Sequence, residues 1–237
     1  MKGEGLYVNS LVSLMKKFRY IKEPIPRNVY FGKEVGICNI CHEKKAGMDA
    51  GVFSIRGNLG FVCTDCLSGG RLQKKTEKDQ EPMFQDRFEA LVNEANPYQL
   101  AVQLKKQNPN LSDKEAKRIA DERTEEVMYR TPSFSSWQEH SWPNHCGDYC
   151  ELQGEVGQEE LNHLTPDSQG RKLLANMLFW EGDYPRDLES DFGGMTTDDF
   201  WKYLPDHAPR NNTDPTSYLI LFKCLECAKL MGVIDFD

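Results

Sequence analysis

The eight cysteines of this chain come in four close pairs, and their spacing has a clear chemical meaning. Thiolates at C-x-x-C spacing hold tetrahedral Zn²⁺ in reducing compartments, whereas disulfides are typical of secreted proteins. We therefore predict two structural Zn²⁺ ions, each bound by two of the pairs. The predicted ligands are Cys38, Cys41, Cys63, Cys66, Cys146, Cys150, Cys224 and Cys227.

The first two pairs predict a zinc ribbon. Between them, residues 51–62 alternate in polarity around a turn at Gly57-Asn58, which is typical of a β-hairpin. Two tight turns would aim four thiolates at one point and leave no coordination position open for a substrate. A redox dithiol in either pair and ordinary buried cysteines are the alternatives.

The last pair indicates half of a second ribbon-like site. Residues 218–222 and 232–236 have the apolar pattern of buried strands, and Cys224 and Cys227 lie in the turn between them. Such a half-site needs two more ligands. The C-x-x-x-C pair at 146–150 supplies the thiols that remain, so we predict a second Cys₄ site.

The stretch 145–150 also contains an imidazole and a carboxylate. His145 or Asp148 in place of one cysteine is therefore the alternative ligand set. A catalytic interpretation would have His145 activate the thiol of Cys146 or Cys150, with Asp148 orienting the imidazole. Adjacent residues on a turn seldom point at one another, and such triads normally come from separate segments, so we predict no enzyme activity.

Composition narrows the class of protein. The chain has 237 residues, of which 39% are hydrophobic and 28% charged, so its supply of core residues is lean and metal would help it fold. The formal charge of −8 argues against non-specific nucleic-acid binding, because that affinity comes from Lys and Arg. A cationic protein partner fits the charge better.

No sequence feature predicts a membrane location. No run approaches the ~18 apolar residues of a membrane helix, and Asn9, Ser10 and Ser13 interrupt the N-terminal apolar run, unlike in a signal peptide. We expect a soluble, cytoplasmic protein.

The predicted fold is α+β, with two small zinc-centred β elements and surrounding helices. We expect a zinc-ribbon region at 1–80, a helical connector at 81–132 and a second zinc-knuckle region at 133–237, or all three in one compact domain.

Capping signals predict two helices, one starting at Asn96-Pro97 and one at Ser112, which forms a capping box with Glu115. A further helical stripe is expected at Leu173, Leu174, Met177 and Leu178.

A loop-rich segment after residue 180 combines acidic and aromatic side chains, which would suit contact with a cationic partner. The alternative is a solvated loop whose aromatics lie in the core. The candidate partner-binding residues are Trp180, Asp183, Tyr184, Asp187, Glu189, Asp191, Asp198, Asp199 and Trp201, and two further aromatics, Phe192 and Phe200, are interleaved with them.

Several blocks together resemble the CbrC family, small bacterial proteins named for a member linked to colicin E2 tolerance. They run from Phe18-Arg-Tyr20 and the first two cysteine pairs, through residues 130–138 and 145–150, to Leu221-Phe-Lys-Cys224-Leu-Glu-Cys227. The chain departs from the family at the helices of 97–130, at the loop of 183–215, and at Ala228, where members usually carry glycine.

The resemblance implies a non-enzymatic, zinc-stabilised protein that confers tolerance or immunity to an antibacterial toxin by protein binding. The alternative is a zinc-ribbon nucleic-acid binder or transcription accessory, and a thiol–disulfide redox protein ranks last because no thioredoxin-like context is present. A basic patch near the first ribbon would serve the nucleic-acid alternative: Lys33, Lys44, Lys45, Arg56, Arg71, Lys74 and Lys75.

Overall fold

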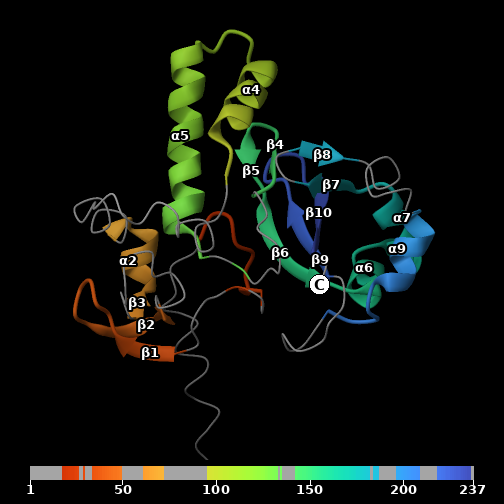
Figure 1. Cartoon of the computed structure of the whole chain (residues 1–237), viewed down its shortest axis with the longest axis horizontal. Helices are drawn as coiled ribbons and strands as arrows, with labels where there is room; N and C mark the ends of the chain where they lie inside the picture. Colours follow the sequence, from red (N-terminus) through yellow and green to blue (C-terminus); the bar gives the residue numbers. More distant parts are fainter. Residues whose placement is uncertain are drawn as a thin grey trace, which may run out of the picture.

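A computed structural model describes residues 18–26, 29, 34–49, 61–71, 95–132, 134, 142–181, 184–186, 196–208 and 218–235. Within them the chain combines helices with sheets of three, five and two strands, which confirms the mixed α+β class (Figure 1).

The three-stranded sheet contains the first cysteines. Strands β1 (Glu34–Ile37), β2 (Lys44–Asp49) and β3 (Phe61–Cys63) are antiparallel in that order, and helix α2 (Thr64–Ser68) follows directly. Gly47 lies opposite Cys63, and a Cβ there would be 2.2 Å from the Val62 carbonyl oxygen. A glycine is therefore needed for β2 and β3 to approach so closely. The predicted turn at Gly57-Asn58 lies outside the described residues.

Two longer helices form an antiparallel hairpin, α4 (Pro97–Gln107) and α5 (Asp113–Arg130) (Figure 1). Both start where predicted. The Asn96 side chain accepts hydrogen bonds from the first turn of α4, and Ser112 Oγ accepts from the Glu115 amide at 3.2 Å. The Glu115 carboxylate meanwhile pairs with the Arg118 guanidinium one turn further along α5.

The five-stranded sheet has the order β6-β9-β10-β7-β8. Strands β9 (Tyr218–Lys223) and β10 (Leu230–Asp235) are antiparallel neighbours, so the predicted strand, turn and strand are present. The other strands are β6 (Glu151–Val156), β7 (Leu178–Glu181) and β8 (Tyr184–Arg186). Strand β6 pairs with β9 on the far side from β10, and β7 runs parallel to β10.

Short helices lie beside this sheet: α6 (Gln158–His163), the 3₁₀ turn η2 (Pro166–Ser168), α7 (Gly170–Ala175) and α9 (Thr197–Tyr203) (Figure 1). The predicted helical stripe at 173–178 is wrong in its second half, because α7 ends at Ala175 and Leu178 begins β7. Phe179 and Trp180 are both buried, and a short run of buried apolar residues fits a strand as well as a helix.

One cluster of buried residues includes members of all three predicted regions, among them Val62, Leu100, Val127 and Phe222. The region boundaries themselves stay a prediction. Among the described residues there is no helix with the length and apolar character needed to cross a bilayer.

Candidate metal centres

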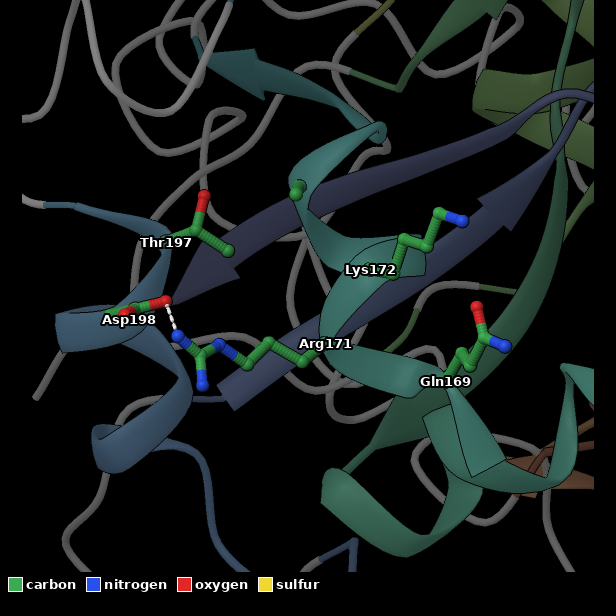
Figure 2. Close-up of a pocket in the computed structure, with 6 residues that line it drawn as sticks. Gln169, Arg171, Lys172, Thr197 and Asp198 are labelled. Atoms are coloured by element: carbon green, nitrogen blue, oxygen red, sulfur yellow. Dashed lines mark ion pairs between the residues drawn. The ribbon is translucent and has the colours of Figure 1, made fainter. Parts of the chain in front are cut away.

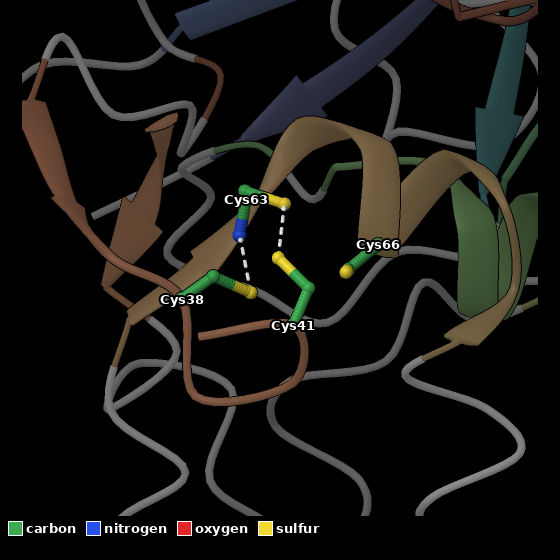
Figure 3. Close-up of side chains that lie close together, drawn as sticks. All are labelled: Cys38, Cys41, Cys63 and Cys66. Carbon is green, nitrogen blue, oxygen red and sulfur yellow. Dashed lines mark hydrogen bonds between the residues drawn. The ribbon is translucent and has the colours of Figure 1, made fainter. Parts of the chain in front are cut away.

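The first two cysteine pairs meet at one end of the three-stranded sheet (Figure 3). Cys38 and Cys41 lie on the turn after β1, Cys63 ends β3, and Cys66 lies in α2. Their four sulfurs lie within 4.8 Å of one another, and those of Cys41 and Cys63 are 3.8 Å apart. Sulfurs about 2.3 Å from a tetrahedral ion are separated by about 3.8 Å, so this group fits a bound metal ion.

The second of these pairs is not on a turn like the first. Cys63 is the N-cap of α2 and Cys66 lies in its first turn, so a helix takes the place of the second knuckle expected in a zinc ribbon. Residues three apart lie on the same face of a helix. Both thiols can therefore point at one ion without a second tight turn.

Backbone amides tune the thiols of this first group. Burial by itself would raise the pKa of Cys38, but hydrogen bonds to its sulfur outweigh this effect. The N–H groups of Cys63 and Ile40 donate to Cys38 Sγ at 3.3 and 3.4 Å, and together with Cys41 they lower the pKa of Cys38 to about 6. Burial instead raises the pKa of the Cys63 and Cys66 thiols. A metal ion entering this group must therefore displace protons from those two residues at neutral pH.

A second group forms where two turns meet. The first turn joins strands β4 (Asn144–His145) and β5 (Asp148–Tyr149), and the second, carrying Cys224 and Cys227, joins β9 to β10. Potential ligand atoms of His145, Cys146, Cys224 and Cys227 lie within 4.8 Å of one another. The Nδ1 atom of His145 is 3.4 Å from Cys227 Sγ.

Cys150, predicted as a ligand, is not part of this group. The turn between β4 and β5 contains just two residues, so the chain has passed through β5 before it reaches Cys150. That thiol is fully buried, 3.5 Å from Met231 Sδ, and its burial raises its pKa. The structure thus favours the alternative ligand set, in which His145 takes the place of one cysteine.

Asp148 takes part in other interactions. Its carboxylate accepts hydrogen bonds from the Tyr20 hydroxyl at 2.9 Å, from the Tyr149 amide and from the Arg19 guanidinium. This arrangement fits neither a metal ligand nor a residue that orients His145 for catalysis. Sequence reasoning had assigned no role to Arg19 or Tyr20, although both belong to a block that carries the family resemblance.

The helical hairpin holds the β4–β5 turn in place. The Gln103 side chain accepts from the Gly147 amide at 3.2 Å and donates to the Asn144 carbonyl at 3.4 Å. Arg123 donates to the Gly147 carbonyl oxygen. Gly147 has φ +69°, a backbone conformation that favours glycine, and a Cβ there would lie 2.8 Å from Gln107 Oε1. No local sequence signal identified Gln103 or Arg123, because both lie far from the turn in the chain.

The two C-x-x-C turns share one backbone pattern. The amides of Cys38 and Cys224 donate to the carbonyls of Glu43 and Lys229, at 2.9 and 2.8 Å. The fifth residue of each turn donates back to the first cysteine and has positive φ, 61° at His42 and 59° at Ala228. A left-handed residue closes each turn, which explains why glycine would suit position 228.

The predicted partner-binding residues are dispersed. Trp180 is 1% exposed and Phe200 is buried, so these two belong to the core rather than to a surface. Asp199 caps α9 by accepting from Thr196, and Trp201 packs partly buried against the core. Tyr184 lies in β8, and Asp183, Asp187, Glu189, Asp191 and Phe192 lie outside the described residues.

Asp198, the remaining acidic candidate, pairs with Arg171 across an open pocket of about 500 Å³ between α7 and α9 (Figure 2). Gln169, Lys172, Ala175 and Thr197 complete its lining. The ion pair neutralises Asp198, so this residue is a weak attractor for a cationic partner.

The basic patch near the first metal group is partly neutralised. Lys45 Nζ lies 2.6 Å from a Glu43 carboxylate oxygen and 3.0 Å from one of Asp65. Lys44 and Arg71 are exposed, whereas Lys33, Arg56, Lys74 and Lys75 lie outside the described residues.

Fold and site together define a mixed α+β protein with two cysteine-rich groups that could each hold a metal ion. The chain belongs to UPF0167, an uncharacterised protein family, which it matches over residues 15–236. It is 34% identical over 224 residues to UPF0167 proteins of Mycobacterium bovis and Mycobacterium tuberculosis, covering 94% of this chain and of each relative. A UPF0167 protein of Pseudomonas aeruginosa is 30% identical over 119 residues, 50% of this chain and 54% of the relative. No solved structure matches.

Substitution of His145 and of Cys150 should show which of the two is the fourth ligand of the second group. We expect His145→Ala to lose the metal ion of the second group to a mild chelator, because three thiolates remain. Cys150→Ala should keep that ion and lose about 1–2 kcal/mol of stability, because it removes a buried sulfur. Metal per chain after chelation, measured by atomic emission, decides between them. Metal loss in Cys150→Ala with full retention in His145→Ala would contradict the assignment.

The left-handed backbone at position 228 predicts a stabilising substitution. Ala228→Gly should raise the free energy of unfolding by about 1 kcal/mol, because glycine adopts positive φ without the steric cost that alanine has. Ala46→Gly is the matched control: Ala46 lies within β2 with an ordinary backbone, so the same change there should lower stability by about 0.5–1 kcal/mol. Denaturant unfolding of both metal-loaded variants measures the difference, and a loss of stability in Ala228→Gly would refute the backbone argument.

Proposed function

We propose that this protein is a zinc-stabilised, non-enzymatic binding protein in which both metal ions are structural. The observation that supports this is the composition of the two groups: four cysteines in one, and three cysteines with a histidine in the other. Zn²⁺ takes four such ligands in structural sites, whereas catalytic zinc keeps a position open for water or substrate. With all four positions filled by protein, neither ion would have room for a substrate.

The partner in this proposal is a cationic protein domain. Seven thiolates and two divalent ions would add three negative charges to the formal −8 of the polypeptide, giving about −11. An acidic protein associates rapidly with a cationic surface, and nuclease toxins present such surfaces where they hold phosphates. Together with the resemblance to the CbrC family, this supports toxin tolerance or immunity, exercised in the cytoplasm, as the biological role.

Metal content tests the structural half of the proposal. The chain purified without added metal should contain two zinc ions. Their removal by a strong chelator should lower the melting temperature by roughly 10 °C or more, because a loss of only ~5 kcal/mol has that effect in a chain of this size. Readdition of zinc should restore the original value. A metal-free chain with the same melting temperature would rule the proposal out.

Protection against a toxin tests the functional half. Sensitive bacteria that express the chain should survive colicin E2 better than cells with an empty vector. The purified chain should bind the toxin with an affinity that falls as salt rises, because screening weakens the attraction between opposite charges. A chain lacking the second metal group, through Cys224→Ser and Cys227→Ser, is the control that should protect less. If the chain gives no protection and does not bind the toxin at low salt, this role is eliminated. Salt-sensitive binding to DNA instead would favour the nucleic-acid alternative.

A further inference from the structure

The two metal groups differ in how they meet solvent. In the first group Cys38, Cys63 and Cys66 are completely buried, and only Cys41 is partly accessible. In the second group Cys227 is exposed and Cys146 partly so. Residues 225–229, which include most of the turn that carries Cys227, are all exposed. A dissolved reagent can therefore reach a sulfur atom of the second group far more easily than one of the first.

The exposed sulfur of Cys227 also has neighbours with which it can react. Cys224 lies on the same turn, Cys146 lies on the facing turn, and their sulfurs are within 4.8 Å of Cys227 Sγ. A sulfenic acid formed on an accessible cysteine is converted to a disulfide when a second thiol is this close. In the first group the sulfurs lie equally close to one another, so the difference between the groups is the access of a reagent: Cys41 is partly exposed, whereas Cys227 is exposed.

We propose that the second metal group is an oxidation site for hydroperoxides, in which Cys227 is the residue oxidised first and the metal ion is released. This inference rests on the proposed function, because it assumes that the group holds zinc. The Cys227 thiolate attacks one oxygen of hydrogen peroxide and breaks the O–O bond, giving a sulfenic acid and hydroxide. The thiolate of Cys224 or Cys146 then attacks that sulfur, forms the S–S bond and expels a second hydroxide.

The electrons and the charge balance in this sequence. Two thiolates lose two electrons to make one disulfide, and the peroxide accepts them and, with two protons from solvent, leaves as two molecules of water. The metal ion loses two of its three anionic ligands. One thiolate and one imidazole bind zinc much more weakly than four ligands do, so the ion leaves.

The fold around this group does not depend on the ion alone. Gly147 is held by Gln103 and Arg123, and Asp148 is held by Tyr20 and Arg19. The turn with Cys224 and Cys227 is closed by backbone hydrogen bonds between neighbouring strands. Release of this ion should therefore leave the five-stranded sheet folded. Reduction of the disulfide with added zinc should restore the metal-bound group.

The test uses the zinc-loaded full-length chain treated with a few equivalents of hydrogen peroxide. Released zinc is followed with a chromogenic chelator, and the cysteines are mapped by mass spectrometry at the end of the first phase. We expect one zinc per chain to leave at least about tenfold faster than the other, with Cys227 in a disulfide to Cys224 or Cys146. Release of both ions at one rate, or a first phase in which Cys227 stays reduced, would overturn the proposal.

Matched histidine variants sharpen the result. Cys227→His keeps a zinc ligand but removes the thiol that peroxide oxidises first, so the fast phase of zinc release should disappear. Cys41→His makes the same change in the first group and should keep the fast phase. If either variant fails to hold zinc, disulfide mapping in the unaltered chain still decides. A chain that is isolated without zinc would refute the proposed function, whereas a chain with two zinc ions and no fast phase would refute this inference alone.

Discussion

The pairing of β6 with β9 is the constraint on which the second cysteine-rich group depends. Glu151 at the start of β6 lies opposite Lys223 at the end of β9. The segment just before β6 is therefore brought next to the segment just after β9, and these two segments carry the four potential metal ligands of the second group. Sheet register, which the buried apolar faces of both strands fix, thus brings these residues together without requiring a bound ion.

The two groups consequently differ in how far the fold around them would depend on a bound metal ion. The first group joins elements that are close in the chain, and its small three-stranded sheet buries few large side chains among the described residues. An ion bound there would contribute directly to folding, as in other small metal-stabilised units. The second group joins turns that a five-stranded sheet and a helical hairpin already hold, so an ion bound there would only add a cross-link to an existing scaffold. This difference follows from topology rather than from ligand chemistry.

Local signals in the sequence predicted local structure well. Three features were predicted in this way: the Asn96 and Ser112 caps, the strands beside Cys224, and the close approach of Cys38 to Cys41 and of Cys224 to Cys227. All depend on residues within a few positions of one another. The errors arose where one pattern fits two structures. Cys63-x-x-Cys66 suits a helix start as well as a knuckle, and buried Phe179 and Trp180 suit a strand as well as a helix. The choice of His145 over Cys150 needed the length of the β4–β5 turn, which no local signal in the cysteine spacing specified.

Helix α5 links the surroundings of both metal groups. Near its middle, Arg123 binds the Gly147 carbonyl beside the second group. At its end, Arg130 packs against Gly70, where a Cβ would lie 3.1 Å from the guanidinium, just after the helix that carries Cys66. Both contacts are made by polar side chains, and α5 also carries exposed ion pairs along its surface. Its sequence therefore resembles that of a solvated helix. Its amphipathic pattern is weak because the helix is fixed by hydrogen bonds and a few small buried residues, Ala116, Ala120 and Val127 among them, rather than by a broad apolar face.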